Sequence, residues 1–293
     1  MKTGNERHAV LIMSASLNSQ LYRLIDAMTY KDNDIFLHLD KKAPCPSYEE
    51  LLDLKNKGVR FFQAIEVNWA GYSLVKAELF LLEKVVKSDV NYKYIHLLSE
   101  SDLPIASNKR IHEYLKNRTE EFVEIQEVNE EQSLRRVRYY YPLQELIGKK
   151  HNFLWAVQKA FVLLERMFHI NRITMESKSI AKGSNWFSIT EDFATFVLEQ
   201  SDWIEKVCHK GQAVDELFIQ TILVNSAFST RRSNNEEGSL RYIVWENKNS
   251  PRILRSKQDF DGIENSGKLF ARKFDENRSN NIMMKILAKI KKG

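Results

Sequence analysis

Short apolar segments alternate with amphipathic segments along the first hundred residues. Apolar runs predict buried strands at 9–14, 34–39, 59–62 and 94–98. Apolar positions spaced three and four residues apart predict helices between them at 19–28, 47–57 and 73–86. Because strands that alternate with helices form parallel βαβ units, we expect a parallel sheet with helices on both faces.

The pattern is less regular in the remainder of the chain. It predicts a further strand at 186–189 and helices at 152–168, 191–200 and 214–224. No internal repeat and no linker rich in Gly, Pro or Ser divides the sequence. We therefore predict a single domain over 1–280, with halves at about 1–118 and 119–280, followed by a tail at 281–293.

The predicted helix at 152–168 is apolar over more than half of its surface. This composition favours a buried helix or a packing interface. The alternative is a face that contacts lipid or a lipid-linked substrate.

The tail combines apolar and basic residues. Ile282, Ile286 and Ile290 fall on one face of a helix together with Met283 and Leu287, and lysines surround them. This pattern is typical of a basic amphipathic helix that lies on an anionic membrane. A packed terminal helix with solvated lysines is the alternative.

The charge balance excludes one large class of function. The sequence has 44 basic and 39 acidic residues, and the whole surplus of five lies in 271–293. The rest is neutral by count, so the chain is no diffuse polybasic nucleic-acid binder.

Cysteine content and hydropathy indicate the compartment. Two cysteines, Cys45 and Cys208, form no disulfide framework and no four-cysteine zinc site, which favours a reducing environment. No apolar run approaches the roughly 18 residues that span a bilayer. We expect a cytoplasmic protein that attaches peripherally to the inner face of the membrane through its tail.

Several familiar catalytic motifs are missing from the sequence. It contains no GxGxxG, GxxxxGK[ST], HExxH, GxSxG or CxxC pattern, and its seven histidines are scattered singly. Dinucleotide, P-loop, zinc-peptidase and hydrolase interpretations therefore lose support.

Acidic residues follow two of the predicted strands. Asp40 ends the strand at 34–39, where a carboxylate accepts hydrogen bonds from a base or ribose, or simply forms a surface turn. Glu100 and Asp102 follow the strand at 94–98, and such an acid pair holds Mg²⁺ or Mn²⁺ in many nucleotide-sugar transferases. Alternatively, Asp102 caps a helix that has Pro104 in its first turn.

Two further charged pairs are candidates for chemistry. Asp215 and Glu216 begin an apolar helical run, where the helix dipole alone stabilises acids. Glu216 is a candidate general base, provided that it lies about 3 Å from an acceptor hydroxyl. Arg272 and Lys273 stand between two phenylalanines and suit phosphate oxygens, although a solvated charged turn has the same composition.

The order and spacing of these segments resemble the core-2/I-branching β-1,6-N-acetylglucosaminyltransferase family, which also includes peptide O-xylosyltransferases. The resembling segments are HLDKK (38–42), NWAGYSLVKAEL (68–79), YIHLLSESDLPI (94–105), GSNWFSIT (183–190), VDELFIQTIL (214–223) and LFARKFD (269–275). Together they extend over nearly the whole chain. The low cysteine content and the lack of a membrane anchor differ from the animal enzymes and suggest a bacterial-type member.

The resemblance implies a GT-A type fold, an α/β nucleotide-sugar domain that works by inversion and without a divalent metal. By resemblance, Asp40 contacts uracil, Trp69 lies beside the nucleotide and Glu216 is the catalytic base. Arg272 and Lys273 replace the metal at the diphosphate.

The remaining assignments by resemblance concern the walls of the cleft. Ser184, Asn185 and Trp186 line the acceptor and donor-sugar cleft, and Asp215 is placed on the acceptor side. A separate arginine of the family has its counterpart at Arg252 or at the nearby Arg255. Glu100 and Asp102 join the donor side, and they keep a metal site open as an alternative.

The expected activity is transfer of a sugar, N-acetylglucosamine, from a UDP-sugar to a hydroxyl of a glycan or lipid-linked glycan during surface polysaccharide or glycolipid synthesis. No cofactor, metal or nucleic-acid partner is expected. The alternatives are a UDP-xylose-dependent enzyme and a non-catalytic relative that binds nucleotide or carbohydrate.

Overall fold

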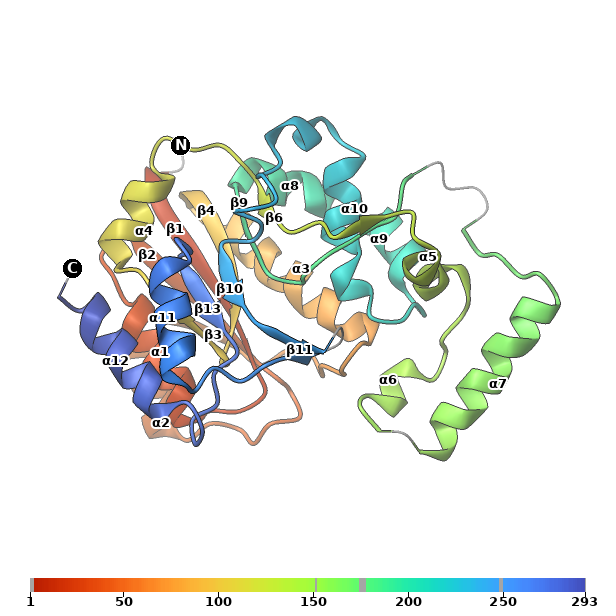
Figure 1. The fold of residues 1–293 in the computed structure, drawn as a ribbon, viewed down its shortest axis with the longest axis horizontal. Coiled ribbons are helices and arrows are strands. Elements are labelled where there is room, and N and C mark those ends of the chain that lie inside the picture. Colours follow the sequence, from red (N-terminus) through yellow and green to blue (C-terminus); the bar gives the residue numbers. More distant parts are fainter. Residues whose placement is uncertain (1–2, 151, 174–177, 248–249, 293) are drawn as a thin grey trace.

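The computed structural model describes residues 3–150, 152–173, 178–247 and 250–292. It is a mixed α/β structure around a six-stranded central sheet of order β3-β2-β1-β4-β9-β6 (Figure 1). The first four of these strands are parallel, and β9 pairs antiparallel with both β4 and β6. The sheet strands are β1 (Thr3–Ser14), β2 (Asn33–Leu39), β3 (Val59–Phe62), β4 (Val90–Ser99), β6 (Phe122–Val123) and β9 (Phe187–Ile189).

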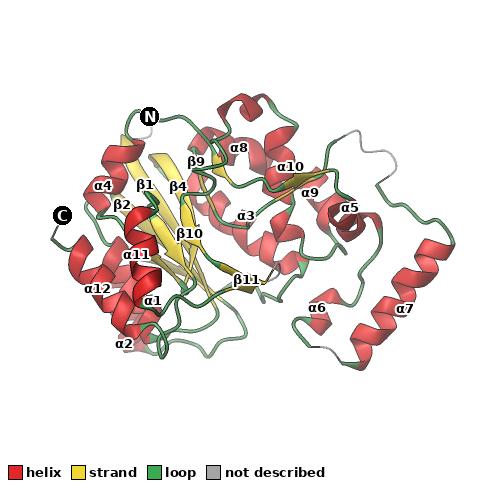
Figure 2. Cartoon of the chain, viewed as in Figure 1, coloured by secondary structure: helices red, strands yellow, loops and turns green. Residues whose placement is uncertain are grey.

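Helices cover both faces of this sheet (Figure 2). Alternate residues of β1 belong to two separate apolar cores, with Leu11 in one and Ile12 in the other. The first core contains side chains of α3 (Tyr72–Val86), α8 (Glu191–Glu199), α9 (Ser201–Cys208) and α10 (Phe218–Val224). The second contains side chains of α1 (Ser19–Met28), α2 (Tyr48–Asn56), α4 (Asn108–Leu115), α11 (Lys257–Asn265) and α12 (Asn280–Ile290). The predicted helix-covered, mostly parallel sheet is confirmed.

Smaller elements complete the fold. A three-stranded sheet of order β10-β13-β5 contains β10 (Arg241–Ile243), β13 (Phe270–Arg272) and β5 (Asp102–Pro104). Two-stranded sheets pair β7 (Glu127–Val128) with β8 (Ala181–Lys182) and β11 (Trp245–Asn247) with β12 (Ser250–Pro251). The remaining helices are α5 (Glu131–Arg138), α6 (Gln144–Ile147), α7 (Phe153–Met167) and the 3₁₀ turns η1 (Val214–Glu216) and η2 (Ala227–Arg231).

The C-terminal helix α12 corrects one sequence-based expectation. Ile282, Met283 and Ile286 are at most 3% exposed and belong to the second core, and Leu287 and Ile290 pack against it. The apolar face of this helix is therefore occupied by protein and is not offered to a membrane. The alternative, a packed terminal helix with solvated lysines, describes the structure.

One predicted local structure also differs. The helix at 214–224 is divided, because η1 ends at Glu216 and α10 starts only at Phe218. In the described part of the chain, no helix is both long enough and apolar enough to cross a bilayer.

Candidate active site

Asp102 and Arg272 face each other across the small sheet. Strand β13 pairs antiparallel with β5 so that these two residues are register partners. The fully buried Asp102 carboxylate accepts hydrogen bonds through Oδ2 from Ser99 N at 2.7 Å, Ser99 Oγ at 2.8 Å and Arg272 Nη1 at 3.4 Å. The expected helix cap at Asp102 is wrong, because 102–104 is a strand and Ser107 caps the following helix. Asp102 instead orients the arginine.

The Arg272 guanidinium stacks on Trp186. Its Cζ lies 3.8 Å from the centroid of the indole ring, within the range of a cation–π contact. Trp186 is half-buried and immediately precedes β9. This contact brings the predicted diphosphate-binding segment against the predicted acceptor-side segment.

Lys273 lies in a local excess of positive charge. Burial lowers the pKa of its ammonium, and the neighbouring charges of Lys149 and Arg272 lower it further. None of the described residues accepts a hydrogen bond from this ammonium. Lys149 also lies over the Trp69 ring, with Nζ 5.9 Å from the centroid. Asp102 pairs with Arg272, and the charge of Glu100 also acts on Lys273, but the ammonium of Lys273 itself donates to no carboxylate of the described residues. The remaining excess of positive charge favours binding of an anion at this point.

Glu100 completes this side of the site. It is half-buried, and burial followed by the charge of Asp102 raises its pKa, against the influence of Arg272 and Lys273. Among the described residues, no three His, Cys, Asp or Glu side chains converge as metal ligands. Since Asp102 already bonds Ser99 and Arg272, this acid pair does not offer two free carboxylates.

Asp40 anchors the loop that leads to Trp69. It follows β2 and is 9% exposed, and its Oδ1 accepts hydrogen bonds from Lys42 N at 2.9 Å and Val67 N at 3.2 Å. Trp69, two residues after Val67, is 55% exposed. A largely exposed indole beside an excess of positive charge offers a stacking surface for a planar base.

Glu216 lies at the end of η1 and faces Arg136. Glu216 Oε2 accepts a hydrogen bond from Arg136 Nη1 at 2.6 Å, and the Glu216 side chain is 36% exposed. The ion pair orients the carboxylate while Oε1 bonds no described residue. The carbonyl of Glu216 accepts a hydrogen bond from Gly183 N at 3.0 Å.

A short turn connects the two halves of the site. Gly183 is three residues before Trp186, and three peptide units span at most about 11 Å. A Cβ on Gly183 would lie 1.7 Å from the carbonyl oxygen of Glu124, so only glycine fits here. The turn therefore holds Glu216 near one of its ends and the stacked Arg272 at the other.

The other residues of this turn are more buried. Ser184 is 6% exposed, and its carbonyl accepts a hydrogen bond from Gln220 Nε2 at 2.7 Å. The amide oxygen Oδ1 of Asn185 is buried and bonds no described residue.

Asp215 points away from its neighbour Glu216 and into the interior. Its Oδ1 is buried without a hydrogen-bond partner among the described residues, and burial, then the charge of Glu216, raises its pKa to about 7. Glu78 of α3 is fully buried close to Asp215, and the side chain of Asn185 lies beside its carboxyl group. Burial, with the charge of Asp215, raises the pKa of Glu78 well above its ordinary value. The predicted acceptor-side Asp215 thus belongs to a buried pair of carboxyl groups.

The Glu78→Gln variant tests this pair. Native Glu78 stays protonated at pH values where the same side chain in the unfolded chain has already ionised, so its contribution to the free energy of unfolding falls as pH rises above about 4.5. The expected slope is about 1.4 kcal/mol per pH unit up to the folded pKa. Glutamine does not ionise. The free energy of unfolding of the variant, measured with urea, should therefore rise relative to that of the wild type by this amount for each pH unit.

The control is the same acid-to-amide change at an exposed position, Glu66→Gln, measured in the same way. A pH-independent difference for Glu78→Gln would mean that Glu78 is charged in the native protein.

Arg252 is engaged elsewhere in the structure. Its guanidinium forms a two-pronged ion pair with Asp259, which is fully engaged in the capping box of α11. Arg252 is therefore not free for a diphosphate, whereas Arg255 is exposed and its side chain bonds no described residue. The predicted donor role of Arg252 is not supported by this arrangement.

The sequence analysis missed three side chains at the site. Arg136 lies in a basic and aromatic stretch, RRVRYYYP (135–142), whose composition alone does not indicate a partner. Lys149 carries no signal in the sequence. Glu78 falls in the resembling segment at 68–79 but was not singled out there, because it becomes informative only through its spatial neighbours.

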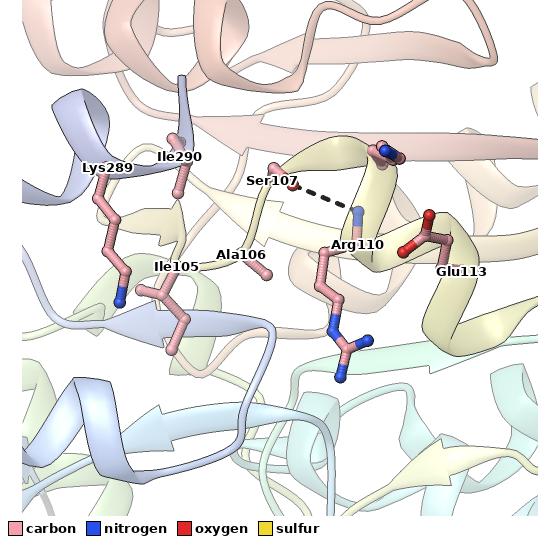
Figure 3. A pocket seen from close by; sticks show the side chains of 8 residues that line it. Ile105, Ala106, Ser107, Arg110, Glu113, Lys289 and Ile290 are labelled. Atoms are coloured by element: carbon pink, nitrogen blue, oxygen red, sulfur yellow. Dashed lines mark hydrogen bonds between the residues drawn. The ribbon is translucent and has the colours of Figure 1, made fainter. Parts of the chain in front are cut away.

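A hollow of about 390 Å³ lies apart from these residues, between α4 and α12 (Figure 3). Ser107 Oγ accepts the capping hydrogen bond from Arg110 N at its edge. The lining contains neither the basic pair nor Glu216, so this hollow is separate from the candidate active site.

Comparison with protein families agrees with this arrangement. The model described as "Branch: Core-2/I-Branching enzyme" matches residues 10–263. The chain belongs to the Core-2/I-Branching enzyme family. The matched range includes Glu216 and ends before Arg272, so the role of the basic pair depends on the geometry described above.

Relatives are similar at low identity. A human N-acetyllactosaminide β-1,6-N-acetylglucosaminyl-transferase is 24% identical over 272 residues, covering 87% of this chain and 65% of its own length. The xylosyltransferase oxt of Drosophila pseudoobscura pseudoobscura is 24% identical over 215 residues, covering 71% of this chain and 22% of its own length. That of Drosophila melanogaster is 22% identical over 240 residues, covering 80% of this chain and 25% of its own. The chain thus spans less than two thirds of each of these relatives.

Proposed function

We propose that this family member is an inverting glycosyltransferase of GT-A type that moves a sugar from a UDP-sugar to a hydroxyl of a glycan or lipid-linked glycan. The observation that carries the proposal is the unpaired Lys273 ammonium beside Lys149 and Arg272. Fixed cations suit a nucleoside diphosphate, which gains negative charge as it leaves. The exposed Trp69 provides a stacking surface for the base.

The reaction proceeds as a single displacement. Glu216 Oε1 takes the proton from the acceptor hydroxyl as that oxygen attacks the anomeric carbon. The bond from this carbon to the diphosphate breaks, and its electron pair leaves with the phosphate oxygen. Arg272 and Lys273 stabilise the charge formed there, and attack from the opposite face inverts the anomeric centre.

N-acetylglucosamine is the proposed donor sugar, with xylose as the second candidate. The names of the relatives support both, since one describes an N-acetylglucosaminyl-transferase and two describe xylosyltransferases. Transfer is proposed to proceed without a divalent metal, because Asp102 is already bonded to Arg272.

Calorimetric titration tests the proposal. UDP, UDP-N-acetylglucosamine and UDP-xylose are each added in EDTA and again in Mn²⁺. We expect binding in EDTA that Mn²⁺ changes by less than about threefold, since the protein's own cations replace the metal.

Binding that requires Mn²⁺ would instead place a metal at Glu100. If no nucleotide binds under either condition, the proposal is refuted. If nucleotides bind but no sugar is transferred to acceptor glycans, the protein is a non-catalytic relative of the family.

A further inference from the structure

Helix α7 buries polar side chains and exposes apolar ones. Its only buried residues are Gln158 and Glu165. Gln158 Oε1 accepts a hydrogen bond from Leu143 N at 3.0 Å, and Glu165 Oε2 accepts one from Tyr140 N at 2.9 Å. The helix is therefore attached to the segment before it through polar contacts, the reverse of the usual amphipathic arrangement.

The outward face of α7 is strongly apolar. The exposed side chains include Phe153 (80%), Leu163 (55%), Leu164 (51%), Met167 (66%) and Phe168 (74%). Spacings of three, four and seven residues place them on one continuous face together with Val157 and Phe161, which are also exposed. Soluble monomers rarely expose such a continuous apolar surface, which indicates a partner.

The charges around this face indicate the chemistry of the partner. Lys159 and Arg166 border it on the helix, and the exposed Lys150 precedes the helix. The one acid of the helix, Glu165, is turned inward. If two chains packed symmetrically through this face, Lys159, near the middle of the helix, would lie close to the same lysine of the second chain, and the two charges would repel each other. Anionic lipid headgroups would instead neutralise the charge of Lys159.

The position of α7 leaves this face accessible. Figures 1 and 2 show α7 at the edge of the molecule, at the opposite end from α12. We propose that α7 is an interfacial anchor that lies in the headgroup layer of an anionic membrane, with its apolar face towards the acyl chains. This inference goes beyond the transfer reaction and does not depend on it.

Sedimentation of the full chain with lipid vesicles tests the anchor. The chain should bind phosphatidylcholine vesicles that contain phosphatidylglycerol more tightly than vesicles of phosphatidylcholine alone. The variant L164Q/M167Q/F168Q should lose about tenfold or more of this binding, because three exposed apolar side chains no longer enter the lipid. The variant K159Q/R166Q should lose about fivefold per cation, and only with the anionic vesicles.

The matched control is L51Q/L52Q/M284Q, which removes three exposed apolar side chains from α2 and α12 and should bind as the wild type does. Melting temperatures check that every variant is folded. Equal binding by the wild type and the α7 triple variant would overturn the anchor. So would a lipid-free dimer, seen by ultracentrifugation, that the α7 triple variant dissociates, because the face would then belong to a second copy.

Discussion

Replacing Glu216 with glutamine should slow sugar transfer by about two to four orders of magnitude, the usual loss when a general base is removed. Glutamine keeps the shape of the side chain, and its amide oxygen can still accept the hydrogen bond from Arg136. It has no carboxylate to take the proton of the acceptor hydroxyl. The affinity for UDP should stay within about twofold, since Glu216 makes no contact with the cations proposed to bind the diphosphate.

Two measurements separate this chemical role from a structural one. Turnover is measured with saturating donor and acceptor, and the melting temperature is recorded for the same protein. The control is Glu199→Gln, an acid-to-amide change at the end of α8, which should leave the rate unchanged. Near-normal turnover of Glu216→Gln would remove this residue from the role of base.

The Lys273→Ala variant should show the second large effect. A hydrogen bond to a charged group contributes about 1.5–3 kcal/mol, so UDP affinity should fall by about 10- to 100-fold. Because the leaving diphosphate becomes more negative in the transition state, kcat/KM should fall further, by about 100- to 1000-fold. Lys273→Arg should recover part of the UDP affinity and part of kcat/KM, since arginine restores the positive charge on a side chain of different shape.

Lys291→Ala is the matched control, because it removes one exposed lysine that directly follows the last residue of α12. Arg272 is less suitable as a first target, since its removal would leave the buried Asp102 without its ion-pair partner and would destabilise the fold. Unchanged UDP affinity for Lys273→Ala would refute the placement of the diphosphate.

The sheet and its helices were predictable because strand and helix periods are local properties of the sequence. The rule that ligands bind at the carboxyl ends of parallel strands then indicated Asp40 and the residues after Ser99 as site candidates. The sequence analysis offered a helix cap at Asp102 and missed the strand at 102–104, because its partner, β13, lies 170 residues away in the sequence. No local pattern contains that pairing.

The two amphipathic helices show more clearly that a local sequence pattern does not reveal tertiary contacts. Both α7 and α12 combine apolar and basic residues, and the sequence analysis favoured the membrane for α12 and burial for the helix at 152–168, with lipid contact there as the alternative. The structure covers the apolar face of α12 and leaves that of α7 exposed, a difference decided by tertiary packing alone. The buried neighbours Glu78 and Asp215 were hidden for a similar reason, since one lies in α3 and the other in η1.

The pairing of β5 with β13 also bears on how the chain folds during its synthesis. Asp102 leaves the ribosome long before Arg272, and at about 5–20 residues per second the interval is roughly ten to thirty seconds. Throughout that interval the strand at 102–104 has an open edge, and Trp186, which is made about halfway through it, has no guanidinium to stack on until Arg272 follows. Nascent chains stalled before residue 270 should therefore be prone to pairing with one another and unable to retain a nucleotide, even with the parallel sheet already formed.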